Sequence, residues 1–243
     1  MKRFRLFAGP NGAGKSTLIK EVNTEFNLGY FINAYEIQKE LFTKQFLHCS
    51  SYIPNVVTQR DWVNFIKDYK NQDARVDEQT KNIITIKENI LVRKKEIQSY
   101  EAAVNASFFR NQLLHCDETF SFETVMSHPS KIDFLQKAKQ NKFRTYLYFI
   151  STLDRDINTS RVKARVAKGG HNVSDDKIES RYYRSMELLQ KAFVIADRAF
   201  IIDNSRLNEH KVLARKNKDK IHILEDEIPE WIDEYLLTKL NLE

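Results

Sequence analysis

The stretch GPNGAGKST, residues 9–17, decides the fold that this sequence predicts. It matches the pattern G-x-x-x-x-G-K-[ST], with an apolar strand pattern before it (RFRLFA, 3–8) and a helical pattern after it (15–26). The glycines let the backbone curl so that successive N–H groups face the phosphates of a nucleotide. We therefore expect a nucleoside triphosphate at this loop, bound by Gly9, Pro10, Asn11, Gly12, Ala13, Gly14, Lys15, Ser16 and Thr17.

Two side chains of this loop carry its chemistry. Lys15 places a cation at the β and γ phosphates, and the Ser16 hydroxyl can bind Mg²⁺. The expected cofactors are therefore ATP and Mg²⁺, with Ser16 as the metal ligand from the chain.

Short strand patterns alternate with helical patterns along most of the chain. Strands are predicted at 3–8, 30–32, 120–124, 144–151 and 198–203, and helices at 15–26, 36–46, 130–139 and 176–196. Another short strand is expected at 222–224, and a last helix after Pro229. Such alternation predicts a parallel sheet covered on both faces. The expected fold is a three-layer α/β P-loop domain with the layout of nucleotide kinases, spanning residues 1–243.

Residues 55–115 interrupt this rhythm. The segment contains no Gly or Pro, and β-branched residues recur every seven positions at Val76, Ile83, Ile90, Ile97 and Val104. A heptad pattern is typical of helices that pack side by side. We expect a helical hairpin inserted into the domain, with an intermolecular coiled coil as the alternative.

Composition excludes several classes of protein. Hydrophobic residues at 42% and aromatic residues at 12% supply enough apolar surface for a core and argue against a disordered chain. No apolar run approaches the ~20 residues that a membrane-spanning helix needs, and the apolar stretch after the basic N-terminus is too short for a signal peptide. Cys49 and Cys116 have no metal-ligand spacing and make no disulfide framework. We expect a cytoplasmic protein with no membrane partner.

Positive charge is concentrated in the second half of the chain. The formal net charge is +6, and residues 139–220 hold 19 Lys and Arg against 10 Asp and Glu. Such a region suits a phosphate-bearing ligand or a nucleic acid, and a solvated surface is the plain alternative. Nucleic acid is the less expected partner, because charge alone supports it.

The loop by itself does not name the reaction. ABC-type and SMC-type ATPases use similar loops, but they also need an LSGGQ-like signature and an apolar strand that ends in Asp-Glu, and neither is present. The GTPase motif N-K-x-D is absent as well. The remaining class is the kinases, in which arginines from a mobile lid assist phosphoryl transfer.

Four blocks of sequence, in order, resemble those of zeta-toxin-type P-loop kinases, which are also described as predicted ABC-type ATPases. The blocks are GPNGAGKST, NAYEI (33–37), FSFETV (120–125) and RVKARVAKGGHNVSDDKIESRYYRS (161–185). The ending ADRAFIIDNS (196–205) is typical of the compact bacterial members. The resemblance implies an ATP-dependent kinase of a UDP-N-acetyl sugar, and many members are held inactive by an antitoxin.

The chemistry of these blocks agrees with the resemblance. Glu123 ends a strand where open α/β sheets bind substrate, and the family assigns it to the acceptor sugar. Guanidinium groups around Gly169 and Gly170 suit the charge on a transferring phosphoryl group. They belong to Arg161, Arg165, Arg181 and Arg184. Asn204 follows the last strand, where adenine is often held, and His171 is interpreted as a residue that packs in the lid.

Tyr35 is a departure from the family pattern. The family's N-A-D-E-I block has an Asp that would accept the proton of the attacking hydroxyl, and this chain has Tyr35 there. A phenol with a reference pKa near 10 is a poor base at neutral pH, so Glu36 is the candidate replacement. The alternative function is a catalytically weak or inactive nucleotide-binding module that regulates or binds another protein.

Overall fold

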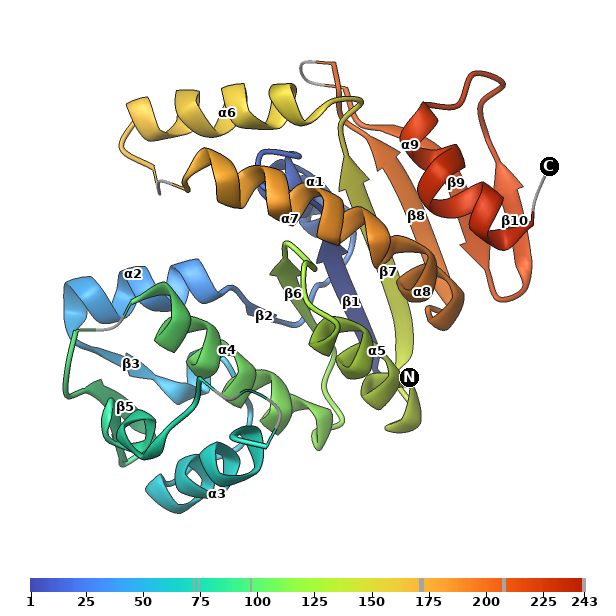
Figure 1. Ribbon diagram of the computed structural model, residues 1–243. Helices are drawn as coiled ribbons and strands as arrows, with labels where there is room; N and C mark the ends of the chain where they lie inside the picture. The colour runs from blue at the N-terminus through green and yellow to red at the C-terminus, as the bar shows by residue number, and fades with distance from the viewer. Residues whose placement is uncertain (72, 74, 97, 171–172, 207–208, 242–243) are drawn as a thin grey trace. The chain divides into compact units, whose positions relative to one another are not determined.

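The structure is a computed structural model that describes residues 1–71, 73, 75–96, 98–170, 173–206 and 209–241 (Figure 1). The chain divides into two compact units. The larger unit contains Met1–Leu28 and Ser121–Glu243, and the smaller unit contains Gly29–Phe120. Each unit is described by itself below.

The sheet of the larger unit has its strands in the order β10-β9-β8-β7-β1-β6. They are β1 (Arg3–Ala8), β6 (Phe120–Thr124, whose first residue belongs to the smaller unit), β7 (Arg144–Ser151), β8 (Arg198–Asp203), β9 (Lys211–Asn217) and β10 (Lys220–Ile223). β1 pairs in parallel with β7, and β7 pairs in parallel with β8, whereas β8, β9 and β10 pair antiparallel. The fold is therefore α/β with a mostly parallel sheet, as the alternating patterns predict.

The helices of the larger unit surround this sheet (Figure 1). They are α1 (Lys15–Glu25), α5 (Ser130–Gln140), α6 (Arg155–Ala167), α7 (Asp175–Glu187), α8 (Leu189–Ile195) and α9 (Glu230–Ile232), which turns of π-helix and 3₁₀-helix continue to Leu240. α5 and α8 pack on β7, and Trp231 of α9 contacts Phe149 of β7. No helix in the described part of the chain has the length and apolar character needed to cross a membrane.

An aromatic cluster anchors α5 to the sheet. Phe4 of β1, Phe122 of β6 and Phe134 of α5 have ring centroids 5.2 to 5.5 Å apart. Phe4 and Phe122 are fully buried. Such tilted and edge-to-face pairs add about 0.5–1.5 kcal/mol each beyond the area that they bury. The cluster fixes the strand on which Glu123 lies.

The smaller unit has its own three-stranded sheet and core. Its elements are β2 (Tyr30–Ile32), α2 (Ala34–Lys44), β3 (Phe46–His48), a 3₁₀ turn (Cys49–Ser51), α3 (Gln59–Tyr69), a second 3₁₀ turn (Glu78–Asn82), β4 (Ile84–Lys87), β5 (Ile90–Arg93) and α4 (Ser99–Leu114). The sheet order is β3-β5-β4. Trp62 is fully buried, packs edge-on against Phe108 at 5.5 Å, and donates from its indole N–H to the carbonyl of Lys81.

The helical hairpin expected for residues 55–115 is wrong in its middle part, between α3 and α4. β4 and β5 form an antiparallel hairpin where the heptad pattern predicts helix, and Ile97 lies outside the described residues. Glu88 and Asn89 have φ of 52° and 59°, and two such residues make the tight turn that matches strand twist. Burial follows the strand period in both stretches, with Ile84 and Ile86 buried in ITIK and Leu91 buried in ILVR. The β-branched residues at heptad spacing in this stretch therefore form strands, which such residues favour, and not one face of a helix.

Most other predicted elements are present. The five strands predicted first match β1, β2, β6, β7 and β8. The predicted helix at 176–196 is two helices, α7 and α8, which meet at Leu188. β9 has no counterpart among the predicted strands, and its antiparallel pairing with β8 extends the sheet.

Candidate functional site: a P-loop with a facing carboxylate

The loop between β1 and α1 has the backbone shape that its glycines allow. Gly12 and Gly14 have φ of 80° and 94°, which side-chain-bearing residues rarely adopt. A Cβ at Gly12 would lie 2.4 Å from the Asn158 carbonyl oxygen, and one at Gly14 would lie 2.0 Å from Asn204 Nδ2. Both positions therefore require glycine for conformation and for packing.

This loop presents unbonded donors, which is the property that an anion needs. Among the described residues, no hydrogen-bond acceptor faces the backbone N–H groups of Gly12, Gly14, Lys15 or Ser16. Lys15 and Ser16 also begin α1, where the helix dipole favours negative charge. The loop fits the phosphates of a nucleotide, and Ser16 fits a Mg²⁺ ion that phosphate oxygens help to hold.

Lys15 is buried and held by its own loop. Its Nζ donates to the carbonyl oxygens of Gly9 (2.9 Å) and Pro10 (2.8 Å). Burial lowers the pKa of Lys15, the Glu123 carboxylate counteracts this, and Arg165 adds to the lowering. The ammonium group is thus preorganised at the position where phosphate charge would enter.

Glu123 faces Lys15 and Ser16 from the end of β6. Its Oε1 lies 3.9 Å from Lys15 Nζ, and Ser16 Oγ donates to its Oε2 at 3.3 Å. The Glu123 side chain is 17% exposed. The turn after Thr124 helps to place it, because Met126 has a φ of 55° and donates its N–H to Thr124 Oγ1. A carboxylate, a hydroxyl and an ammonium group therefore meet at the end of the P-loop.

Asn204 and Arg161 hold the loop after β8 against the P-loop. Asn204 Nδ2 donates to the Ala13 carbonyl at 2.8 Å, and the Asn204 side chain is buried. The Arg161 guanidinium donates to the carbonyl oxygens of Asn204 (2.7 Å) and Ser205 (3.2 Å). In this conformation Arg161 positions the loop where an adenine contact is expected.

α6 and α7 form the arginine-bearing pair of helices. Val162 of α6 and Ile178 of α7 pack together with Val173, which precedes α7. Ion pairs join Arg155 to Glu179 and Lys163 to Asp175. Arg165 is exposed in the last turn of α6.

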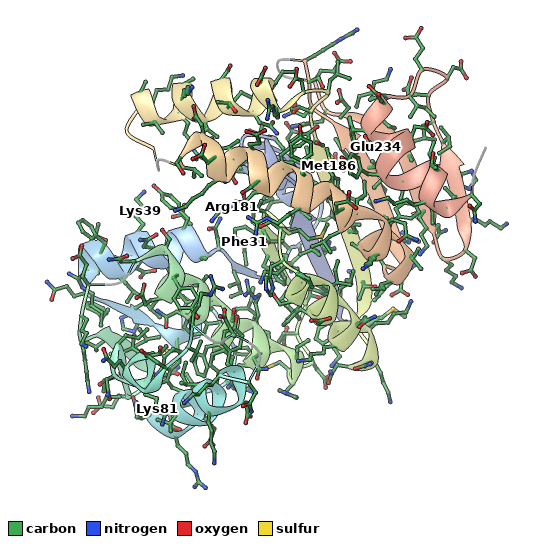
Figure 2. All side chains as sticks on the ribbon, viewed as in Figure 1. Phe31, Lys39, Lys81, Arg181, Met186 and Glu234 are labelled. Carbon is green, nitrogen blue, oxygen red and sulfur yellow. The ribbon has the colours of Figure 1, made fainter. Side chains whose placement is uncertain are left out.

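Arg181 is half-buried on α7 (Figure 2) and has no hydrogen-bond partner among the described residues. Burial lowers its pKa, and neighbouring Arg184 lowers it further. A guanidinium in this state favours an anion as partner.

The remaining predicted residues lie elsewhere. Tyr35 and Glu36 belong to the smaller unit, in the first turn of α2, where Asn33 Oδ1 accepts both of their backbone N–H groups. Both side chains are exposed. His171 lies outside the described residues.

Asn158 and His210 are not among the residues predicted from the sequence. Asn158 is fully buried, accepts from Thr152 Oγ1 at 2.9 Å, and packs against Gly12. His210 Nδ1 lies 2.8 Å from Glu21 Oε2. Asn158 lies three residues before Arg161 on the same face of the helix, and this spacing could have marked it as a site residue. No sequence pattern pointed to His210.

The fold and this loop together define a P-loop α/β protein of kinase-like layout. A chain of the AvrRxo1-ORF1:AvrRxo1-ORF2 complex with ATP aligns over 100% of this chain and 64% of its own length, with a TM-score of 0.56 and 12% identity. The same complex with sulphate ions gives a TM-score of 0.57 at 12% identity, covering 97% of this chain and 63% of that one. This chain thus spans just under two thirds of those chains.

A chain of the PezAT chromosomal toxin-antitoxin system of Streptococcus pneumoniae has a TM-score of 0.54 and 12% identity, covering 98% of this chain and 79% of that one. At such identities the likeness shows the fold alone. An uncharacterised protein of Haemophilus influenzae is 38% identical over 63 residues, which are 26% of this chain and 45% of that protein. No family model matches the sequence.

Proposed function

We propose that this protein is an ATP-dependent phosphotransferase of zeta-toxin type that acts on a hydroxyl of a small molecule, with a UDP-N-acetyl sugar as the first candidate. The observation that carries the proposal is the meeting of Lys15, Ser16 and Glu123 at the end of the P-loop. The loop and its lysine are common to NTP-hydrolysing proteins and kinases, and in the proposed kinase the carboxylate beside them orients the acceptor hydroxyl. The similar folds from a toxin-antitoxin system and from a complex with ATP support this choice.

In the proposed reaction the acceptor oxygen bonds to the γ-phosphorus of ATP while the bond to the β–γ bridging oxygen breaks. ADP leaves, and the hydroxyl proton passes to a carboxylate. Glu123 orients the hydroxyl, and Glu36 is the proposed proton acceptor in place of the missing Asp. Lys15 and the guanidinium groups of Arg161, Arg165 and Arg181 stabilise charge on the transferring group. A bound Mg²⁺, with Ser16 as ligand, would neutralise phosphate charge.

Ser16 and Glu123 are bonded to each other in this structure, so both must reorient when substrates bind. This reorientation predicts a measurable difference between ATP binding and phosphoryl transfer. Removing the Glu123 carboxylate should hinder transfer without weakening ATP binding, because it frees Ser16 and removes a negative charge beside the phosphates.

The test is incubation of the purified chain with γ-labelled ATP and a panel of nucleotide sugars, followed by chromatography of the labelled products. Labelled sugar from the wild type, and none from Lys15→Ala, would support the kinase. ATP binding without transfer to any acceptor would favour the alternative, a nucleotide-binding module, which Tyr35 in place of the expected Asp supports. An antitoxin is the proposed protein partner, and co-purification with the product of a neighbouring gene tests it.

A further inference from the structure

One face of the sheet in the larger unit collects arginines around a tyrosine. Strand register determines which side chains share this face, because paired residues point to the same side. Tyr146 of β7 pairs with Arg5 of β1 and with Arg198 of β8. Along the same line, Arg198 pairs with Asn217 of β9, which pairs with Lys220 of β10. We call the group Arg5, Arg144, Arg198, Arg215 and Lys220 around Tyr146 the guanidinium face.

Three of these arginines lie over the Tyr146 ring. The guanidinium carbons of Arg5, Arg198 and Arg144 are 5.4, 5.8 and 5.9 Å from its centroid. A cation over an aromatic ring gains about 0.5–1 kcal/mol at partly exposed sites. Tyr146 itself is 8% exposed, so the ring serves as the floor of the cluster.

The paired strands themselves supply little negative charge to this face. In the described strands β1, β7, β8, β9 and β10, no position that the pairing places on this face is an Asp or Glu. Arg144 even pairs directly with Arg3, and like charges at opposed positions destabilise a sheet. Several like charges therefore lie close together on these strands, and a bound anion would offset their repulsion.

Two donors in the cluster are buried and unbonded. Arg5 Nε and Arg198 Nε have no hydrogen-bond partner among the described residues. Arg5 is 3% exposed, and its Nη1 donates to the Asn27 carbonyl at 3.0 Å. Leaving a buried donor unsatisfied costs about 1–3 kcal/mol. The Nε groups of these two arginines thus keep donor capacity that no described residue uses and that an anion would satisfy.

The cluster continues into solvent. Arg215, which pairs with Phe200 and His222, is exposed, and so is Lys220. From β1 to β10 the face crosses four strand intervals, about 19 Å at ~4.8 Å each. This length exceeds a single phosphate group, so a chain-like anion matches it better than a small one.

We propose that the guanidinium face binds the phosphate backbone of a single-stranded nucleic acid. Guanidinium forks match phosphate oxygens, and a positively charged surface that follows the backbone is how many proteins hold single strands. Charge alone made nucleic acid a less expected partner at the level of sequence. The structure adds three observations to the charge: the Tyr146 ring beneath the arginines, paired strand positions without carboxylates, and two guanidinium nitrogens without hydrogen-bond acceptors.

The experiment measures fluorescence anisotropy of a labelled single-stranded oligouridylate titrated with the full chain. Arg215→Glu and Lys220→Glu alter exposed positions, so folding should persist, and melting temperature checks this. Each should weaken binding at least about tenfold. Each should also make the dependence of log affinity on log salt concentration shallower, by about 0.7 for every phosphate that the variant no longer binds. The matched control is Lys137→Glu, which makes the same charge change at an exposed position on α5.

Binding that falls in both variants, persists in Lys137→Glu and persists in Lys15→Ala would support the proposal and separate this face from the P-loop. An equal decrease in the control, or no binding by the folded wild type, would overturn it. A polyglutamate of equal charge that competes as well as the oligonucleotide would also overturn it, because the partner would then be an acidic protein segment. The kinase proposal can fail without affecting any of these outcomes.

Discussion

Two clusters of positive charge in the larger unit differ in whether the chain supplies their hydrogen-bond acceptors. At the P-loop the chain itself supplies partners, since Lys15 bonds to two loop carbonyls and lies beside Glu123. On the guanidinium face, Arg5 and Arg198 keep buried donors that no described residue accepts from. The Lys15 ammonium therefore has acceptors before a ligand arrives, whereas two guanidinium nitrogens of the second cluster do not. A cation that has hydrogen-bond acceptors within the chain can stabilise the fold and also serve chemistry. A buried cation whose donors lack acceptors lowers the stability of the fold.

Lys15→Ala should break the P-loop cluster and leave the guanidinium face unchanged. Transfer should fall at least about 10³-fold, because Lys15 is the only charged residue between 9 and 17. Calorimetry should show that ATP no longer binds, and anisotropy should show unaltered oligonucleotide binding. Lys20→Ala, exposed on the same helix, is the control. Normal turnover by Lys15→Ala would refute the assignment of the phosphate site.

Glu123→Gln should separate binding from transfer within the P-loop cluster. We expect transfer to fall about 10²- to 10³-fold, since the amide keeps the shape but not the charge that orients a hydroxyl. ATP affinity should stay equal or increase. Glu25→Gln at the exposed end of α1 is the matched control. Parallel decreases in affinity and rate would instead mean that Glu123 maintains the loop.

Tyr35→Asp tests whether the smaller unit lacks a base. Restoring the carboxylate should raise transfer by about 10²-fold, the low end of general-base catalysis. Tyr35 is 41% exposed, so its replacement should not disturb the core. Product formation is compared with wild type and with Glu36→Gln. If Glu36→Gln alone abolishes transfer, the base has moved by one residue, and a gain in Tyr35→Asp is then not expected.

Gly12→Ala compared with Gly169→Ala tests how tightly the chain packs around the P-loop. Both glycines have a φ near 80°, but a Cβ at Gly12 meets the Asn158 backbone, whereas one at Gly169 meets nothing within 4 Å. Gly12→Ala should lower the free energy of unfolding by about 3 kcal/mol, combining backbone strain with overpacking. Gly169→Ala should lower it by about 1 kcal/mol. Equal decreases in thermal stability would contradict the packing assigned to Asn158.

Arg198→Met tests the cost of the guanidinium face, with the smallest expected effect. The change removes an unbonded donor and a like charge but also a cation–π interaction. These contributions nearly cancel, so the free energy of unfolding should change by less than about 1 kcal/mol. Denaturant unfolding measures it. A decrease beyond about 2 kcal/mol would show that Arg198 has a structural role.

Local pattern predicted the elements around the P-loop well. β1, β6, β7 and β8 are short apolar runs, and each lies between helical patterns, so period and turn residues were enough to find them. Local pattern failed between Val76 and Val104, where β-branched residues at seven-residue spacing fit a helix seam and also favour strands. The positive φ of Glu88 and Asn89 settles that competition, and it is a property of the folded turn.

The sequence by itself determined the P-loop, its lysine and the α/β alternation, because a phosphate-binding loop is built from consecutive residues whose spacing is visible in the chain. Only the tertiary structure decided that Glu123 meets Lys15 and Ser16, that Arg161 holds the loop after β8, and that Arg5, Arg144 and Arg198 surround Tyr146. The fold brings these groups together from distant parts of the chain, 107 residues apart for Ser16 and Glu123 and 43 apart for Arg161 and Asn204. Pairing between distant strands depends on hydrogen bonds and packing that no local pattern encodes.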